Sequence, residues 1–376
     1  MTTRFGFVST FPPTQCGLAT FTAALRGALL HSTTDEGWVV RLVDEPALRP
    51  GDEVVAQLIT DDSASLGQAA AQLNQCDVAI MQHEYGVYGG ADGSQILHLL
   101  DQVRVPCVVV LHTVLTDPTP HQRQVLESVM AKADAVVVMT MTARERLTAG
   151  YAVDMTKVCI IAHGASAPQT TMAEPTFRTG QFTILTWGLL GPGKGIEWGI
   201  EAMAMLRDLL PKPRYLVAGQ THPKVLLHEG EAYRDRLREQ VRQAELGPWV
   251  SFDDHYRNAG ALASLVRSAD VVLLPYDSTD QVTSGVLIEA LAAGKPVVAT
   301  EFPHAQEVLA GGAGLLVPHR DPEAIAAALR SVITRGDVMT RMAAAASATA
   351  PQLLWPVIAD QYRELTGRLI TAGVAA

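Results

Sequence analysis

The sequence predicts an α/β protein with two domains, and three observations lead to this fold class. The chain has 376 residues, which is more than one ordinary hydrophobic core organises and enough for two. Short apolar runs rich in β-branched residues alternate with helix-length segments, as in parallel strands that are buried on both faces and joined by crossover helices. Several runs end in polar or turn-forming residues, at the edge where open parallel sheets bind ligands.

The expected strands fall into two groups, one in each half of the chain. The first group comprises Phe5–Ser9, Val78–Met81, Cys107–Leu111, Ala135–Met139 and Val158–Ile161. The second group comprises Thr183–Trp187, Tyr215–Ala218, Trp249–Phe252, Val271–Leu274 and Val297–Ala299. Residues 165–180 between the groups lack periodicity and are typical of a linker. We therefore expect two Rossmann-like domains, made of residues 1–172 and 173–352.

The end of the chain predicts two helices. Asp321 is the expected N-cap of a helix that has Pro322 at its first position and reaches Thr334. An amphipathic helix is expected from about Leu353 to Ile370, and Pro356 is tolerated only in its first turn. Residues 353–376 are expected to form a C-terminal helix that crosses back and packs on the N-terminal domain.

Composition and charge narrow the classes of partner. A net charge of −10, without a basic run, disfavours binding to nucleic acid or to an anionic membrane surface. No apolar stretch approaches the 18 or more residues of a membrane span, and the chain starts with a strand-like run rather than a signal peptide, so we expect a cytoplasmic protein without membrane insertion. The cysteines are widely spaced, which disfavours zinc sites and disulfides: Cys16, Cys76, Cys107 and Cys159.

Residues 280–296 predict a site for a diphosphate. The backbone N–H groups of Thr283, Ser284 and Gly285 would be free at the start of a helix, where the macrodipole attracts an anion. Glu289 lies one turn along on the same helix face, within reach of ribose hydroxyls beyond the phosphates. The alternative is an ordinary capped helix with a solvated glutamate.

A second phosphate-directed loop follows the expected strand Thr183–Trp187. Its glycines, beginning with Gly188, permit close approach of the backbone to an anion, and Lys194 can neutralise that anion. The spacing matches a P-loop, but Gly195 replaces the Ser or Thr that would hold magnesium, which disfavours a nucleoside triphosphatase. The alternative is a structural loop with a surface lysine, and the nearby diphosphate site favours the phosphate interpretation.

The first half carries polar residues after its strands. Gly17 follows the first strand in a loop without G-x-G-x-x-G, so a conventional dinucleotide-binding dehydrogenase is disfavoured. His83 and His112 each end a strand, and this position favours a functional over a purely structural histidine. No third residue has a spacing diagnostic of metal binding. The side chains expected to suit a polyhydroxylated ligand are His83, Glu84, Tyr85, Tyr88 and His112.

Together these residues resemble the family-4 retaining glycosyltransferases of the GT-B fold, which transfer a sugar from a nucleotide-sugar donor. The resemblance extends over nearly the whole chain. It is carried by the Phe11–Thr20 loop with Gly17, residues 83–90, His112, residues 193–195, residues 285–300 with Glu289, and residues 314–318 before Asp321 and Pro322. It implies that the two domains face each other across a cleft, the first binding the acceptor and the second binding the nucleotide sugar.

The resemblance also implies roles for individual residues. Lys194 would bind donor phosphate, the backbone of residues 283–285 would cradle the diphosphate, and Glu289 would bind ribose. His112 would contact the transferred sugar near the reacting centre, and the backbone around Phe252 would face the base. The expected catalytic residues are His112, Lys194 and Gln281; donor-binding residues are Gly17, Gly188, Lys194, Phe252, Thr283, Ser284, Gly285 and Glu289; acceptor-binding residues are His83, Glu84, Tyr85 and Tyr88.

Two positions depart from the family pattern. Leu189 stands where the family commonly has arginine, and Gln281 stands at the first glutamate of its E-x7-E pattern. Without the arginine, Lys194 and the helix N–H groups alone would stabilise the leaving diphosphate, and one charge-assisted hydrogen bond is worth about 1.5–3 kcal/mol. Since Gln281 cannot be a carboxylate nucleophile, we expect front-face retention, in which the departing phosphate deprotonates the acceptor.

The expected function is therefore a retaining hexosyltransferase acting on a saccharide acceptor, as in oligosaccharide or polysaccharide biosynthesis. GDP-mannose is the favoured donor and UDP-glucose the second, with no metal and no cofactor besides this nucleotide-sugar co-substrate. A homodimer is left open. The alternative from another class is a non-catalytic nucleotide-sugar-binding protein, which the lost charges at Leu189 and Gln281 would suit. A nucleotide-sugar epimerase is weaker, because Gln281 supplies neither acid nor base.

Overall fold

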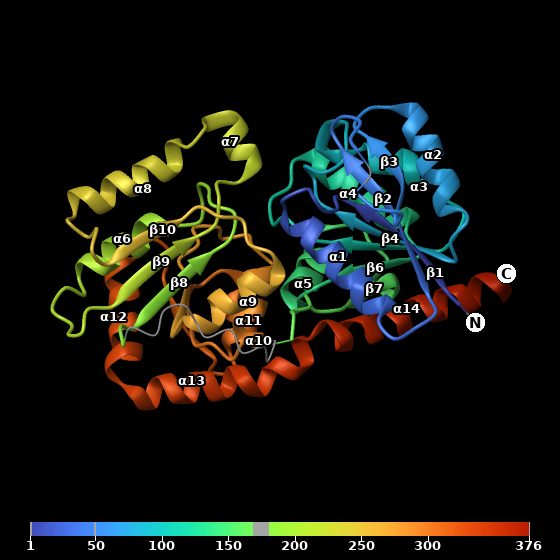
Figure 1. Ribbon diagram of the computed structural model, residues 1–376. Coiled ribbons are helices and arrows are strands. Elements are labelled where there is room, and N and C mark those ends of the chain that lie inside the picture. The colour runs from blue at the N-terminus through green and yellow to red at the C-terminus, as the bar shows by residue number, and fades with distance from the viewer. Residues whose placement is uncertain (1, 49, 168–179, 376) are drawn as a thin grey trace. The chain divides into compact units, whose positions relative to one another are not determined.

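The computed structural model describes residues 2–48, 50–167 and 180–375 (Figure 1). The chain divides into two compact units, one of Met1–Gly164 with Trp355–Ala376 and one of Ala165–Leu354. The expected boundary between residues 172 and 173 lies outside the described residues. Within the described residues, each unit is a parallel sheet with helices, which confirms the predicted α/β fold class.

The first unit contains a parallel sheet with strand order β3-β2-β1-β4-β5-β6-β7. Its strands are β1 Arg4–Ser9, β2 Glu36–Val43, β3 Val54–Ile59, β4 Val78–His83, β5 Cys107–Leu111, β6 Ala135–Val138 and β7 Val158–Ile160. Strands β2 and β3 were not among the expected strands. β3 alternates buried and half-buried residues at the sheet edge and β2 contains the buried Arg41, so neither is a continuous apolar run.

The helices of the first unit are α1 Gly17–Leu30, α2 Ser63–Leu73, α3 Gln95–Leu100, α4 Pro120–Lys132, α5 Met141–Gly150 and α14 Trp355–Ala375. α1 and α14 run side by side (Figure 1) and share one core with the sheet. Phe21 of α1 and Tyr362 of α14 are both buried in this core. The C-terminal helix therefore packs on the first unit as predicted, with Pro356 in its first turn.

The second unit contains a parallel sheet with strand order β10-β9-β8-β11-β12-β13. Its strands are β8 Thr183–Trp187, β9 Arg214–Ala218, β10 Val250–Asp253, β11 Val271–Leu274, β12 Val297–Thr300 and β13 Gly314–Val317. Its helices are α6 Ile196–Ala204, α7 Pro223–Glu229, α8 Ala232–Gln243, α9 Ala259–Ser268, α10 Gly285–Ala292, α11 Pro303–Leu309, α12 Pro322–Thr334 and α13 Gly336–Thr349. The Asp321 side chain accepts the N–H of Ala324 at 2.8 Å, which confirms the predicted N-cap of α12.

The strand orders locate the ligand-binding edges. In the first sheet the order reverses between β1 and β4, and in the second it reverses between β8 and β11. Open α/β sheets bind ligands beyond the carboxyl ends of the strands at such switch points. A ligand site is therefore expected at the loops after β1 and β4 in the first sheet and after β8 and β11 in the second. Among the described helices, none combines the length and apolar character that a membrane span requires.

Candidate functional site

The loop before α10 is held by hydrogen bonds on both sides of Ser284. The Ser284 hydroxyl caps the helix by accepting the N–H of Leu287 at 3.3 Å. The backbone N–H of Ser284 donates to Nδ1 of His304 at 2.7 Å, so it is not free as the sequence predicted. This correction leaves the N–H groups of Thr283 and Gly285 as the expected anion donors of the helix start.

His304 is a site residue that sequence reasoning missed. It lies in the first turn of α11, is only 2% exposed, and donates its backbone N–H to the carbonyl of Gln281 at 3.3 Å. The Gln281 amide donates to the carbonyl of Thr283 at 3.0 Å, and Oγ1 of Thr283 is buried without a partner among the described residues. The sequence offers one signal for this residue: a histidine directly after Pro303, in a helix whose other buried residues, Ala305 and Leu309, are apolar.

Glu289 occupies the expected position one turn inside α10. Its Oε1 accepts the backbone N–H of Ser166 at 3.2 Å. Burial raises the pKa of Glu289 to about 7, because desolvation outweighs the opposing effect of that hydrogen bond. The side chain is therefore divided between its acid and carboxylate forms near neutral pH, and a hydroxyl partner could interact with either form.

The glycine loop after β8 lies next to the start of α10. A Cβ atom placed on Gly188 would lie 3.7 Å from a methyl group of Val286, and Gly188 has a φ of 130°. The glycine loop and the start of α10 therefore lie next to each other within one unit. Gly195 has a packing reason to be glycine: its Cβ would lie 1.7 Å from the carbonyl oxygen of Pro275. This close approach explains why the loop cannot carry the Ser or Thr of a P-loop at that position.

Lys194 lies over the ring of Tyr276, with Nζ 4.4 Å from the ring centroid. The loop that carries it is tied to the segment after β11, because Asp277 donates its N–H to the carbonyl of Gly193 at 3.0 Å. Asp277 in turn accepts the indole N–H of Trp198 at 2.9 Å. Lys194 is thus placed by the aromatic ring at the switch point between β8 and β11.

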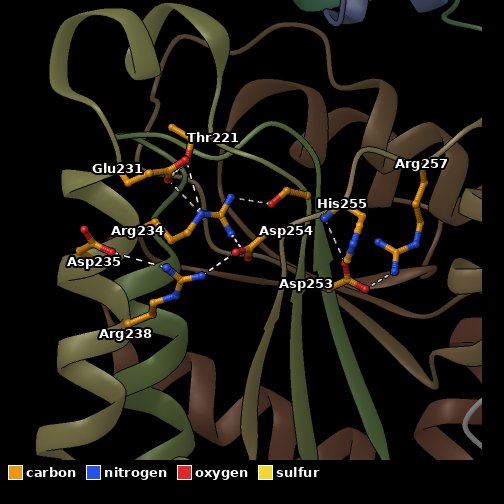
Figure 2. A network of polar contacts seen from close by, with 10 residues as sticks. Thr221, Glu231, Arg234, Asp235, Arg238, Asp253, Asp254, His255 and Arg257 are labelled. Atoms are coloured by element: carbon orange, nitrogen blue, oxygen red, sulfur yellow. Dashed lines mark hydrogen bonds and ion pairs between the residues drawn. The ribbon is translucent and has the colours of Figure 1, made fainter.

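A polar network fixes the carboxyl ends of β9 and β10 (Figure 2). Phe252 of β10 is half-buried. Arg234 of α8 is 2% exposed and donates to the carbonyl of Gly219 at 2.7 Å and to Asp254 at 2.5 Å. Arg238 donates to the other oxygen of Asp254 at 2.5 Å. Arg234 was missed because α8 is rich in charged residues and its sequence alone is typical of a solvated helix.

Asp253 forms a second cluster at the end of β10 (Figure 2). Its carboxylate accepts hydrogen bonds from the His255 ring at 2.9 Å and from the Arg257 guanidinium. Burial alone would raise the pKa of Asp253, but these donors outweigh it and hold the pKa at about 2. Asp253 is therefore a permanent anion near the backbone that is expected to face a base.

The first unit gathers its candidate residues at the ends of β4 and β5. The Glu84 carboxylate accepts the Thr113 hydroxyl at 2.5 Å and the Tyr85 backbone N–H at 3.1 Å. His83 is fully buried, and Tyr88 is 5% exposed with its hydroxyl donated to the carbonyl of Gln82 at 2.8 Å. His83 and Tyr88, both expected to bind the acceptor, offer no surface to a ligand in this conformation, whereas Glu84 and Tyr85 are half-buried.

His112 is held by two neighbours. Its Nε2 lies 2.7 Å from the amide oxygen of Gln82, and its ring packs edge-to-face on Phe21 at a centroid distance of 4.9 Å. Burial lowers the pKa of His112 to about 3, with smaller contributions from His163 and His83. The imidazole is therefore neutral at physiological pH and does not act there as a proton donor through an imidazolium.

Gly17 is the first residue of α1, which Cys16 caps by accepting the N–H of Ala19 at 3.4 Å. A Cβ placed on Gly17 would meet nothing within 4 Å, so the packing of this protein does not require glycine there. That open space is compatible with close approach of a ligand. No three His, Cys, Asp or Glu side chains form a cluster suited to a metal ion in the part of the chain that the structure describes.

Residues 169–349 match the family described as glycosyl transferases group 1. Over this segment the chain is similar to the group 1 glycosyl transferases. The phosphatidyl-myo-inositol mannosyltransferase of Mycolicibacterium smegmatis is 34% identical over 46% of this chain and 43% of that protein. The glycogen synthase of Mycobacterium tuberculosis is 29% identical over 57% of this chain and 49% of that protein. The D-inositol 3-phosphate glycosyltransferase of Kineococcus radiotolerans is 29% identical over 72% of this chain and 68% of that protein.

The alignments with the first two relatives span less than half of the length of those proteins. Solved structures match nearly the whole chain. Sucrose-phosphate synthase from Thermosynechococcus elongatus matches with a TM-score of 0.76 and 18% identity, over 98% of this chain and 100% of that chain. Anabaena HepE in complex with UDP and glucose matches with a TM-score of 0.75 and 18% identity, over 97% and 100%. These likenesses show that the chain has the GT-B fold.

The segment that matches the group 1 glycosyl transferases contains the loop before α10, Glu289 and the glycine loop after β8. The candidate residues of the first unit, His112 among them, lie outside that segment. Sequence reasoning found the loops from their glycines and helix starts. It missed the buried side chains that hold those loops, His304 and Arg234.

Proposed function

We propose that the protein is a retaining glycosyltransferase that moves a hexose from a nucleotide sugar to a hydroxyl group of a saccharide. The observation that carries this proposal is the convergence of the Gly188 loop and the start of α10 within the segment that matches the group 1 glycosyl transferases. Both elements are suited to a diphosphate. Glu289 on the same helix supplies the carboxyl group that a ribose would need.

In the proposed complex the second unit holds the donor. Lys194 balances the charge of the diphosphate, and the N–H groups of Thr283 and Gly285 donate to its oxygens. Glu289 accepts or donates hydrogen bonds at the ribose hydroxyls. The backbone at Phe252 faces the base, on strand ends that the Arg234 network keeps in place.

We propose GDP-mannose as the favoured donor and UDP-glucose as the second. The name of the mannosyltransferase relative supports the first choice, and the UDP bound in Anabaena HepE supports the second. The acceptor is a saccharide, and Glu84 and Tyr85 are the half-buried groups proposed to contact it. We propose no metal requirement, since Lys194 and the helix start supply positive charge at the diphosphate.

The proposed reaction proceeds on one face of the sugar. The C–O bond between the anomeric carbon and the donor phosphate breaks as the acceptor oxygen forms a bond to the same carbon. The departing phosphate oxygen takes the proton of the acceptor hydroxyl. Gln281 cannot serve as a carboxylate nucleophile, and the neutral His112 contacts the sugar rather than titrating during the reaction.

A second candidate is a protein that binds a nucleotide sugar without turnover. It is favoured by Gln281, whose amide is already bonded to the carbonyl of Thr283 at 3.0 Å and serves to hold the loop. Leu189 also provides no charge where an arginine would stabilise the leaving group. This candidate predicts donor binding without release of nucleoside diphosphate.

A panel of donors separates the two candidates. Release of nucleoside diphosphate would be measured from GDP-mannose, UDP-glucose, ADP-glucose and UDP-N-acetylglucosamine, with mannose and glucose oligosaccharides as acceptors and no added metal. Acceptor-dependent release from one donor supports the transferase and names its sugar. Donor binding by calorimetry without release across the panel supports the non-catalytic protein.

A further inference from the structure

Gln82 is a buried amide at the end of an apolar strand. Its side chain is 0% exposed, and it follows Val78–Met81 of β4. Burying an amide without partners costs free energy, so a glutamine at this place needs a compensating interaction. Within the described residues, the amide oxygen of Gln82 bonds to the ring of His112. The amide nitrogen of Gln82 is buried and has no partner among those residues.

The sheet register brings the two residues together. Gln82 of β4 pairs with Val110 of β5, and His112 lies two residues beyond Val110, on the same face. The His112 backbone N–H donates to the carbonyl of His83 at 3.1 Å, which continues the ladder beyond Leu111. The contact between the two side chains therefore follows from the strand pairing of the central sheet.

The chemistry of this contact assigns a proton to one ring nitrogen. An amide oxygen only accepts, so Nε2 of His112 must donate to it across the 2.7 Å distance. Burial keeps the ring neutral, with its pKa lowered to about 3, so Nδ1 then carries the lone pair. The edge-to-face contact with Phe21 restrains the ring from rotating out of this arrangement.

We propose that Gln82 is a positioning residue that fixes His112 in the Nε2–H tautomer, so that His112 meets its ligand as a hydrogen-bond acceptor through Nδ1. The identity of that ligand rests on the proposed function, in which His112 contacts the transferred sugar. A lone pair there selects a sugar that presents a hydroxyl group and repels one that presents a carboxylate. The donor class is therefore a neutral hexose rather than a hexuronic acid at the position facing Nδ1.

The tautomer can be measured without any donor or turnover. Full-length protein labelled with ¹⁵N-histidine would be studied by NMR, and the His112 signals assigned by their loss in His112→Asn. We expect the resting protein to show protonated Nε2 and unprotonated Nδ1. In Gln82→Leu the tautomers mix, whereas Tyr88→Phe, which removes a bond to the backbone carbonyl of the same glutamine, leaves the tautomer unchanged.

A proton on Nδ1 in the resting protein, or an unchanged tautomer in Gln82→Leu, overturns the proposal. Gln82→Met is the second variant if Gln82→Leu does not fold, because it keeps the length of the side chain without the amide oxygen and should mix the tautomers in the same way. An unchanged tautomer in Gln82→Met also contradicts the proposal.

A kinetic arm tests the consequence for the ligand. With the donor found in the panel, Gln82→Leu should lower kcat about 3–10-fold, the effect of one neutral hydrogen bond, with little change in the KM for the acceptor. The matching hexuronic acid donor should be a poorer substrate than the neutral hexose. Equal turnover of both donors contradicts the specificity claim, whereas no turnover of any donor, with the expected tautomer observed, contradicts the proposed function alone.

Discussion

Nδ1 of His304 accepts the backbone N–H of Ser284 at 2.7 Å, so a side chain from α11 anchors the loop that opens α10. A helix start is a general anion site because its N–H groups are free. Here one of those groups is taken, and the direction of the remaining ones depends on the anchor. The loop is therefore fixed before any anion arrives.

Replacing His304 should loosen this loop. His304→Leu leaves the N–H of the nearly buried Ser284 without its acceptor, which should lower the free energy of unfolding by about 1–3 kcal/mol and weaken nucleoside diphosphate binding. His304→Asn retains an acceptor near the position of Nδ1 and should lose less of both. Thermal unfolding and calorimetric titration with GDP and UDP measure the two effects. If both variants lost equal stability and equal affinity for the nucleoside diphosphate, the hydrogen bond from Ser284 to residue 304 would not be the cause.

Removing the charge of Lys194 should slow the proposed reaction. Lys194→Ala should reduce turnover by about 10²–10³-fold, the usual effect of losing one group that stabilises charge in the transition state. Lys212→Ala is the matched control, because Lys212 also lies over an aromatic ring, at 3.9 Å from that of Trp249, but before β9 rather than after β8. Rates of nucleoside diphosphate release compare the two. Full activity of Lys194→Ala would remove this lysine from the mechanism.

The raised pKa of Glu289 predicts a pH dependence of stability. The folded protein holds the pKa at about 7, above the ordinary value of 4.5, so ionisation of Glu289 opposes folding. Below the ordinary pKa this cost is absent, and it grows as the pH rises until it is complete above pH 7. Glu289→Gln, which can still accept the N–H of Ser166, should therefore stabilise the protein at pH 8 relative to pH 5, by on the order of 1–3 kcal/mol.

Thermal unfolding of both proteins across pH 5–8 checks this sign. The melting temperatures of the wild type and Glu289→Gln should be close at pH 5 and diverge as the pH rises, with the variant higher. A difference that stays constant or shrinks with rising pH would show that burial does not raise the pKa of Glu289.

The buried Arg234 should matter more than its exposed neighbour (Figure 2). Arg234→Met removes the donors to the Gly219 carbonyl and to one oxygen of Asp254, and breaking a buried pair typically costs 3–5 kcal/mol, so roughly 2–4 kcal/mol is expected with a partly exposed carboxylate. Arg238→Met removes a pair whose arginine side chain is 46% exposed and should cost less than about 1 kcal/mol. Chemical denaturation measures the free energy of unfolding of the two variants. Equal losses of stability would contradict the claim that the buried Arg234 contributes more than the exposed Arg238.

Elements marked by a continuous run or by a local signal in the sequence were predicted correctly. β5, β8 and β11 begin and end at the expected residues, because each is a run of apolar or β-branched residues buried along its whole length. β3 was missed because its Gln57 and half-buried positions at the sheet edge break such a run. The N-cap of α12 was predicted correctly because Asp321 followed by Pro322 is a local signal.

Side chains that depend on tertiary partners were not predictable in the same way. His304, Arg234 and Gln82 are polar residues that the fold buries against a backbone or side-chain partner far along the chain. Their sequence neighbours do not specify those partners. Tyr88 was expected on a sugar-binding surface for the same reason: its hydroxyl reaches the carbonyl of Gln82, six residues away, and the ring is buried.

The most direct test of the account is the anomeric configuration of the first product. The active donor of the panel would be incubated with its acceptor, and the new glycoside followed by ¹H NMR from the earliest time points. The account predicts an acceptor-linked glycoside with the same anomeric configuration as the donor. A product of inverted configuration, or free sugar without a glycoside, would contradict it.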